Sequence, residues 1–513
     1  MMSKIFTASL LGMEADLVTV ETDIQPGLPA MNLVGLADTT IKEAKERIRA
    51  AILNSDYPFP KHRITVNLSP AGRPKEGSHF DLPIAVGILL LGSERTARQE
   101  KTAFIGELAL DGKVKHIRGA LPLAMGLRER GIRRLVLPYE NLEEVALLRD
   151  LELYPVRSLR ESIEWCLGRR EQSAYKRKKK VKRKIMDQTI DFCDVVSQEN
   201  AKRAITVAAA GNHGILLMGS PGSGKTMLAK RIPAIMPEMS YTEQLEATRI
   251  YSAAGLLSQA CPYIGERPFR MPHHTISRAA LIGGGNRPRP GEISLAHNGI
   301  LFLDEFGEFD PQVTELLRQP LEDGQVTINR AWGSVTFPCR MMLVAAANPC
   351  KCGYLGDDRH TCTCSENQLS RYLSRFSGPV LERIDLHIKV PAVPAQKLEK
   401  KTTALSTAEM KAQVRQAAML QKERYKGTDI CFNGQLTQRQ IQSYCPVTAS
   451  ANRFLKEAYE KLALSMRTYY KIIKVARTIA DLHGTDTIDA YHIAEALQYR
   501  ALDRFYRRPG NGN

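Results

Sequence analysis

The chain has 513 residues, 43% of them hydrophobic, and its 72 lysines and arginines outnumber its 55 aspartates and glutamates, giving a formal net charge of +17. This composition predicts a globular protein of about three domains. The apolar stretches are too short for a membrane span and ten cysteines do not form a secreted disulfide framework, so we expect a cytoplasmic protein with reduced thiols. The positive charge favours a polyanionic partner, or else the excess lysine only keeps the protein soluble.

Residues 1–167 alternate between strand-like and helical patterns. We expect strands at VTVETDI, HRITVNLS and LVLP, and helices near residues 42–53 and 81–91. The alternation predicts a compact α/β domain. Residues 168–190 follow as a linker, in which eight of the nine residues of KRKKKVKRK are basic. Such a segment is either a solvated tether or a clamp for a phosphate backbone, and the sequence leaves both open.

Residues 191–392 contain both halves of a nucleoside-triphosphate site. The first half, GSPGSGKT, follows the apolar strand ILLM, and its glycines let backbone N–H groups surround phosphate oxygens. Lys225 then reaches the β- and γ-phosphates, and the Thr226 hydroxyl holds Mg²⁺. The phosphate-binding loop consists of Gly219, Ser220, Pro221, Gly222, Ser223, Gly224, Lys225 and Thr226.

The second half is GILFLDE, residues 299–305, in which an apolar strand delivers two carboxylates to its end. Asp304 suits the shell of the Mg²⁺, and Glu305 suits orientation or deprotonation of the attacking water. Asn348 ends another apolar strand, in VAAANP, where an amide can hold that water, although a strand-end asparagine is more often only a turn former. Together these residues predict an ATPase that uses ATP and Mg²⁺.

Two arginines are candidates for stabilising negative charge in the transition state. Arg383, in SGPVLERIDLHIKV, can act in its own subunit or reach into a neighbour's site. Its competitor is Arg375, and a buried salt bridge with Asp385 is the structural alternative. Arg467 starts a helix whose inner face could rest on the nucleotide. Its competitor, almost three turns further on, is Arg477, and helix-surface ion pairing is the alternative for either.

The segment NPCKCGYLGDDRHTCTC contains two C-x-C pairs separated by nine residues. Four thiolates can hold Zn²⁺ tetrahedrally, and the glycines between the pairs allow a tight loop. The usual knuckle spacing is C-x-x-C, so free thiols or a reversible disulfide remain alternatives, and His360 is not needed by a closed four-Cys site. The candidate zinc ligands are Cys350, Cys352, Cys362 and Cys364.

Two insertions in the ATPase region lack the periodicity of a long core element. The first, at residues 267–299, is rich in arginine, histidine and glycine, which suit phosphate contacts. The second, VTINRAWGSVTFP, alternates like a β-hairpin. Trp332 near its turn could stack on a base or be buried against a neighbouring subunit. The candidate DNA contacts are Arg270, His273, His274, Arg278, Arg330 and Trp332.

The end of the chain has a helical pattern. Residues 393–435 are charged and predict a helical connector. Residues 436–507 predict a small helical bundle, because apolar residues recur at helical spacing up to Leu482 and the HGT turn begins at His483.

The motifs quoted above, with HHT…GGGNRPRPGEISLAHNGILFLDE, AANPCKCGYLGD and KVARTIADL, resemble those of the magnesium-chelatase-like AAA+ ATPases of the ComM/YifB family over essentially the whole chain. The resemblance implies a helix-2 insert, a hairpin before the sensor-1 strand, a C-terminal lid and a ring, expected to be a hexamer, with ATP between subunits. It also implies a helicase that drives branch migration and integrates single-stranded DNA in natural transformation.

The resemblance also implies a role for each candidate residue. It assigns Lys225 and Thr226 to Walker A, Asp304 and Glu305 to Walker B, Asn348 to sensor 1, Arg383 to the arginine finger and Arg467 to sensor 2. Related sequences commonly have glycine where this chain has Ser197. A magnesium-chelatase motor subunit is the weaker reading, since it would require a separate integrin-like partner subunit.

The N-terminal domain is similar to the proteolytic domain of Lon through GELALDGKVKHIRGALPLAMGLRERGIRRLVLPYEN. A Lon-type site needs a serine whose proton is taken by a lysine. At the corresponding positions this chain has Phe80 and Leu121, while Ser78 and Lys75 lie nearby in sequence. We therefore expect a non-proteolytic scaffold or a DNA-binding collar, with an ATP-dependent Lon-like protease as the alternative.

Overall fold

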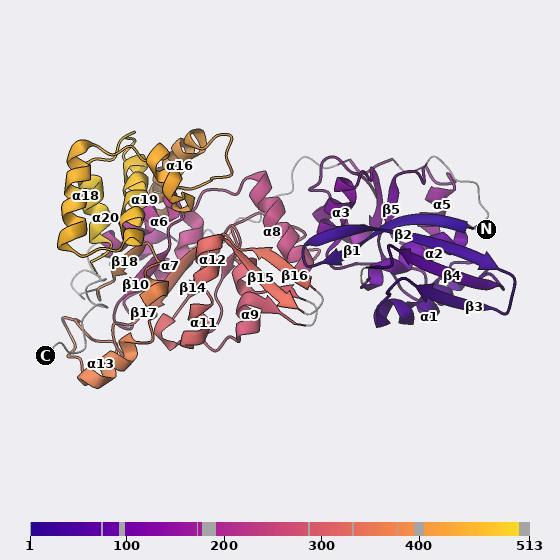
Figure 1. Cartoon of the computed structure of the whole chain (residues 1–513), viewed down its shortest axis with the longest axis horizontal. Coiled ribbons are helices and arrows are strands. Elements are labelled where there is room, and N and C mark those ends of the chain that lie inside the picture. The colour runs from indigo at the N-terminus through magenta and orange to yellow at the C-terminus, as the bar shows by residue number, and fades with distance from the viewer. Residues whose placement is uncertain are drawn as a thin grey trace.

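The computed structural model describes residues 2–72, 75–91, 98–171, 173–176, 191–285, 288–330, 333–376, 378–393 and 405–501. The N-terminal domain lies at one end of an elongated molecule, the nucleotide-binding core occupies the middle, and the C-terminal helices cover the core at the other end (Figure 1). Within these residues, no helix is long and apolar enough to cross a bilayer. Most of the basic linker, residues 177–190, lies outside the described residues.

The N-terminal domain is built on a mixed sheet of seven strands in the order β3-β4-β2-β1-β5-β8-β9. Strands β1 and β2 form a long antiparallel hairpin, whose register runs from Met2 opposite Asp23 to Leu11 opposite Glu14. The seven strands are β1 Met2–Leu11, β2 Glu14–Gln25, β3 Ala30–Val34, β4 Arg63–Ser69, β5 Thr102–Phe104, β8 Arg134–Pro138 and β9 Glu152–Val156, while β6 Glu107–Leu108 and β7 Val114–Lys115 form a separate antiparallel pair. The three strands expected from the sequence are confirmed as β2, β4 and β8.

Helices cover this sheet with apolar faces. In α1 the Asp38 side chain accepts the N–H of Ile41, which caps the helix, and Ile41, Ile48 and Ile52 are buried. Helix α2 is buried from Asp81 to Ile88. The helices are α1 Thr39–Asn54, α2 Asp81–Leu89, α3 Ala120–Glu129, α4 Leu142–Val145 and α5 Leu159–Cys166. The two helices expected near residues 42–53 and 81–91 are therefore confirmed as α1 and α2.

The nucleotide-binding core contains a parallel sheet of five strands in the order β11-β14-β17-β10-β18. Strands β10, β14 and β17 are buried throughout, as expected for continuous apolar runs in a parallel sheet covered on both faces. The strands are β10 Ile215–Met218, β11 Phe269–Arg270, β14 Ile300–Leu303, β17 Met342–Ala347 and β18 Leu386–Lys389. Because the sheet is parallel, its carboxyl ends meet along one edge, where α/β folds bind ligands.

Successive residues of these strands face two different hydrophobic clusters. Ile215 and Leu217 pack with α6 Glu199–Gly211 and α7 Lys225–Ile235, whereas Leu216 and Met218 pack on the other side with the two insertions. The first insertion and its flank contain α8 Tyr241–Ala254, α9 Arg278–Ile282, β12 Gly283–Gly284, β13 Arg289–Pro290 and α10 Glu292–Leu295.

The second insertion is the predicted hairpin, formed by β15 Gln325–Arg330 and β16 Gly333–Pro338. The register pairs Val326 with Phe337 and Arg330 with Gly333. Helices α11 Pro311–Glu315 and α12 Arg318–Asp323 precede it. Trp332 lies outside the described residues, so its two alternatives stay open.

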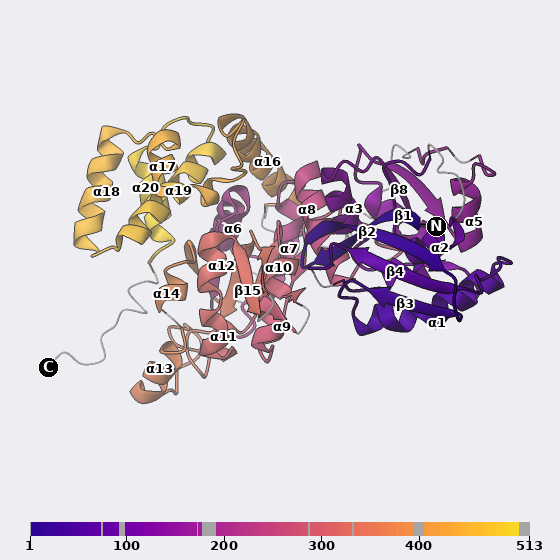
Figure 2. The ribbon, with the colours of Figure 1, turned by 45° about the vertical axis from the view of Figure 1, so that its right-hand side comes forward.

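The C-terminal helices form the lid, which sits against α6 (Figure 2). The predicted connector contains α16, which buries Met410, Val414 and Ala417 in the same hydrophobic cluster as α6 and α19, so this helix packs against the core. Helix α19 ends at Leu482, and His483 caps it where the sequence predicts a turn. The C-terminal helices are α16 Thr407–Arg424, α17 Gln438–Tyr444, α18 Ala449–Lys461, α19 Met466–Leu482 and α20 Ala490–Gln498, whereas α13 Glu366–Leu373 and α14 Gly378–Leu381 precede β18 and belong to the core.

Candidate nucleotide site

The phosphate-binding loop joins β10 to the first turn of α7 at the carboxyl edge of the parallel sheet. Gly222 and Gly224 have φ values of 76° and 90°, which L side chains rarely adopt, and a Cβ at either would meet nothing within 4 Å. The loop therefore turns its backbone toward open space at a helix N-terminus, which suits an anion. Lys225 Nζ donates to the carbonyls of Gly219 at 2.8 Å and Ser220 at 2.9 Å, and burial lowers the pKa of Lys225.

Thr226 and Asp304 bring two oxygen ligands together at the end of β14. Thr226 Oγ1 donates to Asp304 Oδ2 at 2.8 Å. Two neighbouring ligands of an octahedral Mg²⁺ are about 3 Å apart, since each lies about 2.1 Å from the ion. The spacing and the hard oxygen donors therefore fit Mg²⁺, and these residues would hold it between the protein and the phosphates of ATP.

Glu305 follows Asp304 in a left-handed backbone conformation, with φ of 52° and ψ of 45°. A non-glycine residue in this conformation is strained, and such strain is concentrated at functional positions. Its carboxylate is 61% exposed and lies 3.5 Å from Nδ1 of His274, which belongs to the first insertion.

One pocket is lined by Pro221, Gly222, Lys225, Thr226, Asp304, Glu305, Ala346, Ala347 and Asn348.

Asn348 directly follows β17 and reaches the phosphate-binding lysine. Its Oδ1 accepts a hydrogen bond from Lys225 Nζ at 3.2 Å, and its main-chain carbonyl accepts one from the Tyr372 hydroxyl at 3.0 Å. The structure thus brings together Lys225, the two candidate Mg²⁺ ligands, Glu305 and the strand-end amide. This arrangement can bind a nucleoside triphosphate and activate a water at its γ-phosphate.

The two candidate arginines lie together and away from this pocket. Arg383 Nη2 lies 2.7 Å from Glu322 Oε1 in α12, and Arg467 contacts the same oxygen. Neither arginine is among the described residues that line the pocket. Sequence reasoning misses Glu322, because no spacing or motif marks a carboxylate shared by residues 61 and 145 positions further on.

The alternatives for Arg383 take other partners. Asp385 lies 2.5 Å from Lys471 Nζ and 3.1 Å from His213 Nδ1, so the salt bridge considered between Arg383 and Asp385 is replaced by these pairs. Arg375 Nη1 pairs with Glu308 at 3.0 Å and also donates to the carbonyl of Gly307. Lys471 also donates to the carbonyl of Arg383, which joins α19 of the lid to the segment that carries this arginine.

Arg477 is a structural residue of the lid. Its side chain is fully buried, pairs with Asp481 at 3.0 Å and donates to the carbonyls of Thr485 and Asp486. Asp481 also pairs with Arg424 of α16. The guanidinium of Arg477 therefore has its partners inside the lid. Of the two candidate arginines of α19, only Arg467 lies near the protein surface.

The four cysteines converge as the spacing predicts. Their Sγ atoms all lie within 4.8 Å of one another, with Cys350 3.3 Å from Cys352 and 3.7 Å from Cys362. Sulfurs at the corners of a ZnS₄ tetrahedron are about 3.8 Å apart, because each Zn–S bond is about 2.3 Å. The backbone N–H of Cys352 donates to Cys364 Sγ at 3.4 Å. Donor set and spacing therefore fit a closed tetrahedral zinc site.

The candidate DNA contacts divide into two groups. Arg270 forms a bidentate pair with Glu292, with both distances 2.6 Å, and His274 faces Glu305, so these two side chains contact carboxylates of the same chain. His273, Arg278 and Arg330 are exposed.

The tips of the two insertions touch. Arg330 Nε, at the end of β15, donates to the carbonyl of Gly285 at 3.0 Å. A Cβ at Gly284 would lie 3.3 Å from Arg330 Nη2. The hairpin and the first insertion therefore present one joint tip.

Three family models match the chain: magnesium chelatase subunit ChlI over residues 191–398, subunit ChlI of Mg-chelatase over 20–141, and the ChlI C-terminal region over 404–500. Competence protein ComM of Haemophilus influenzae is 40% identical over 99% of both chains, and protein YifB of Escherichia coli is 39% identical over 98% of both. The magnesium-chelatase 38 kDa subunit of Cereibacter sphaeroides is 24% identical over 32% of this chain and 54% of its own.

Proposed function

The chain belongs to the ComM/YifB family of magnesium-chelatase-like AAA+ ATPases, and on this premise we propose that it is an ATP-driven DNA motor. In this proposal it forms a ring, expected to be a hexamer, and acts as a helicase that promotes branch migration and the integration of single-stranded DNA during natural transformation and recombination. We propose that it acts in the cytoplasm, where its ten cysteines stay reduced.

The observation that carries this proposal is the link between the ATP site and the insertions. His274 of the first insertion contacts Glu305 in the pocket, and the tip of the same insertion contacts Arg330 of the hairpin. A polyanion bound at this joint tip can therefore alter the position of the residue that activates water. The net charge of +17 supports DNA as that polyanion.

A ring is supported by the position of the two arginines. Because Arg383 and Arg467 share Glu322 and lie outside their own pocket, we assign both to the nucleotide of a neighbouring subunit. Charge stabilisation by an arginine supplied from another subunit is a known device in phosphoryl transfer. Each active site would then be complete only in the assembled ring.

We propose that Cys350, Cys352, Cys362 and Cys364 hold Zn²⁺. Four thiolates are a closed structural donor set, and such a site leaves no open position for catalysis. This ion would therefore have a structural role, unlike the catalytic Mg²⁺ proposed at Thr226 and Asp304.

Proteolysis is the less favoured function for the N-terminal domain. Phe80 and Leu121, which occupy the positions of the Lon dyad, are fully buried and carry no nucleophile or base. Ser78 donates to the Glu107 carboxylate and Lys75 donates to the carbonyl of Pro70. These partners support a scaffold or a DNA-binding collar.

A branch-migration assay on three-stranded DNA tests the proposal. We compare the wild type with two variants. Lys225→Ala should lose both ATP hydrolysis and strand exchange. Glu305→Gln should still bind ATP and DNA but carry out neither ATP hydrolysis nor strand exchange. ATPase activity without DNA stimulation, combined with no DNA binding at low salt, would refute the motor. Degradation of an unfolded protein with ATP would favour the protease instead.

A further inference from the structure

The four-Cys loop, residues 350–364, lies against the phosphate-binding loop. Asn348 directly follows β17, and the loop begins two residues later at Cys350. The first cysteine is therefore close in sequence to the strand-end amide. Gly353, with φ of 89°, faces Pro221, and a Cβ at this glycine would lie 2.6 Å from Pro221 Cδ and 2.7 Å from Cγ. Real Cβ atoms do not approach other atoms so closely. The two loops are therefore packed together without room for one added methyl group.

A second contact joins the loops through Asp357. Its side chain is 6% exposed, and the neighbouring Ser220 side chain is the main cause that lowers the pKa of Asp357 to about 2. The same carboxylate accepts the N–H groups of Arg359 at 2.9 Å and His360 at 3.0 Å. Ser220 in turn accepts Lys225 Nζ through its carbonyl. The four-Cys loop therefore reaches Ser220, the residue whose carbonyl accepts the candidate phosphate-binding lysine.

A third contact fixes the far side of the four-Cys loop to the sheet. Lys389 Nζ, at the end of β18, donates to the carbonyl of Gly356 at 2.9 Å. Strand β18 is the neighbour of β10, from which the phosphate-binding loop emerges. The four-Cys loop thus bridges two parts of the edge where phosphates would bind.

The loop has almost no apolar core of its own. Between residues 350 and 364 only Cys350 and Gly353 are buried, and most of the other residues are polar or exposed. Apart from the hydrogen bonds to Asp357 and the stacked rings of Tyr354 and His360, the four sulfurs are what this loop encloses. Where a segment cannot bury enough apolar surface, the free energy of metal binding supplies its folding free energy.

We propose that the metal in the four-Cys loop braces the phosphate-binding loop, so that nucleotide binding by this chain depends on the metal. This inference rests on the zinc site proposed above and adds a consequence for the ATP site. Without the metal the four thiols no longer hold the loop closed, and the contacts of Gly353 with Pro221 and of Asp357 with Ser220 are lost. The phosphate-binding loop then gains conformations that do not bind ATP.

The test measures zinc by elemental analysis and affinity for a fluorescent ATP analogue on the purified full-length chain. The wild type should contain one zinc ion per chain. The double variant Cys362→Ser with Cys364→Ser should lose zinc and bind the analogue about tenfold or more weakly, which corresponds to about 1.4 kcal/mol, because the phosphate-binding loop gains conformations that do not bind ATP. The control Cys431→Ser, at an exposed cysteine outside the cluster, should match the wild type in both measurements.

Two further variants separate the metal from its coupling to the ATP site. Gly353→Ala and Asp357→Asn keep all four thiols, so each should retain zinc and still bind the analogue more weakly. A wild type that contains no zinc would refute the metal site, and a zinc-free variant with unchanged affinity would refute the coupling. If the cysteine variant does not fold, unchanged affinity in both Gly353→Ala and Asp357→Asn refutes the coupling. Neither measurement uses DNA, so failure of the proposed motor function would leave these results unaffected.

Discussion

At the scale of single residues, the most informative contact is that between Glu305 and His274. Glu305 is held in a left-handed conformation at the end of β14, and His274 approaches its carboxylate from an insertion that is remote from the phosphate-binding loop in sequence. The His274 ring also lies 6.4 Å from the Phe309 ring, edge to face. Packing therefore restrains the histidine beside the residue expected to activate water.

We predict that His274→Ala raises ATP hydrolysis in the absence of DNA and reduces its stimulation by DNA. Removing the imidazole releases the Glu305 carboxylate, which can then turn toward the attacking water without a signal from the insertion. We expect a change of about threefold to tenfold in the basal rate, equivalent to about 1 kcal/mol.

His273→Ala is the matched control for this prediction. The His273 ring lies 4.1 Å from that of His274, tilted by 33°, but Nδ1 of His273 lies 2.9 Å from the Thr275 hydroxyl. The control should keep the basal rate of the wild type. Steady-state hydrolysis with and without single-stranded DNA measures both effects, and equal basal rates in all three proteins would contradict the prediction.

Residues at the ends of apolar strands could be predicted from the sequence, whereas their distant partners could not. Asp304 and Asn348 each follow a continuous apolar run, and parallel strands bring such positions to one edge. Glu322 and Asp357 lie in polar segments without periodicity, and only the tertiary fold places them against Arg467 and Ser220. Their roles depend on contacts between segments far apart in the chain.

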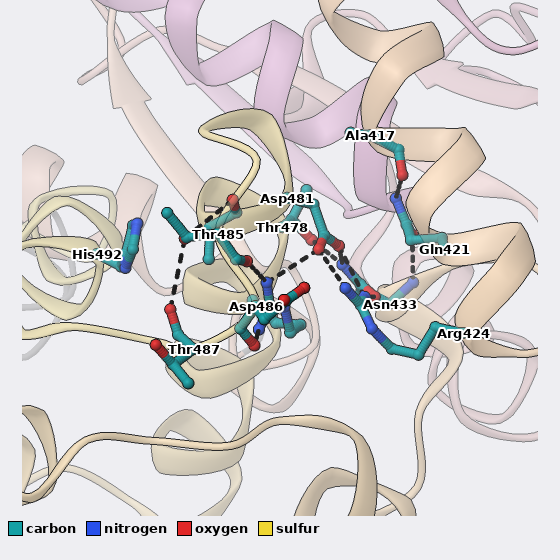
Figure 3. Close-up of polar contacts among 12 residues, drawn as sticks. Ala417, Gln421, Arg424, Asn433, Thr478, Asp481, Thr485, Asp486, Thr487 and His492 are labelled. Carbon is teal, nitrogen blue, oxygen red and sulfur yellow. Dashed lines mark hydrogen bonds and ion pairs between the residues drawn. The ribbon is translucent and has the colours of Figure 1, made fainter.

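At the scale of elements, helix α19 carries one arginine on its surface and one in its interior. Arg477 pairs with Asp481, which lies in one network with Gln421, Arg424 and Asn433 (Figure 3). Buried networks of this kind are stabilising only when each member has its partner. Arg467, in contrast, is 39% exposed at the first turn of the helix.

We predict that Arg477→Ala lowers the stability of the fold, whereas Arg467→Ala lowers the rate of ATP hydrolysis. Arg477→Ala leaves the buried Asp481 short of a partner and should lower the free energy of unfolding by about 3 kcal/mol or more. Arg467→Ala should leave the melting temperature near that of the wild type and lower kcat for ATP. Thermal unfolding and steady-state kinetics on both variants separate these effects. A large loss of stability in Arg467→Ala would contradict the assignment.

The junction between the N-terminal domain and the core contains a buried acidic residue. Burial raises the pKa of Glu144 to about 7, while hydrogen bonds with Ser252 and Asn141 partly oppose this rise. Ser252 belongs to α8, and its carbonyl and hydroxyl accept the N–H groups of Gly119 and Leu121 at the start of α3. The carboxyl group therefore titrates where the two domains are joined.

We predict that this junction is more stable at low pH. The unfolded carboxyl ionises near pH 4.5, whereas the folded one keeps its proton until about pH 7, so the stabilisation from protonation is complete below pH 4.5 and is lost as the pH rises through 7. Glu144→Gln, which is always neutral, should raise the free energy of unfolding at pH 8 by on the order of 2 kcal/mol and by little at pH 5.

The matched control for this prediction is Glu143→Gln, at the exposed neighbouring position. This variant should follow the wild type at both pH values. Thermal unfolding at pH 5 and pH 8 measures the difference, and an equal gain of Glu144→Gln at the two pH values would contradict the role of titration.

Elements with a strong pattern were predictable, and elements whose pattern is diluted by charge were not. The strands β10, β14 and β17 are continuous apolar runs, and the alternation in β15 and β16 has the period of a half-buried hairpin. Helix α16 reads as a charged connector because its buried positions are few, yet it packs on α6. Its role follows from the shape of the surface beneath it.

At the scale of the whole molecule, the N-terminal domain packs on the insertions of the core. Met13, at the turn between β1 and β2, belongs to the hydrophobic cluster that contains the hairpin, and Arg249 of α8 donates to its carbonyl. A Cβ at Gly12 would overlap Val335 of β16. Movement of the hairpin is therefore coupled to the N-terminal domain, which fits a collar around the DNA path in the proposed ring.

Mixing inactive subunits tests how the active sites are shared in that ring. Arg383→Ala subunits retain Glu305, and Glu305→Gln subunits retain both arginines, so neighbours of the two kinds form some complete sites. We expect this mixture to recover part of the wild-type ATPase rate. The rate is measured after the two proteins are mixed at low concentration, where rings dissociate and subunits exchange without unfolding. Each variant alone should remain inactive.

The mixture of Arg383→Ala with Arg467→Ala gives the opposite expectation. Since both arginines contact Glu322 in one chain, each site receives its pair from a single neighbour. Every subunit in this mixture lacks one of the two, so no site is complete and no activity should return. If Arg467 instead acted on the nucleotide of its own chain, a site hosted by an Arg383→Ala subunit beside an Arg467→Ala neighbour would be complete. Recovery of activity in this mixture would therefore overturn the shared placement of the two arginines.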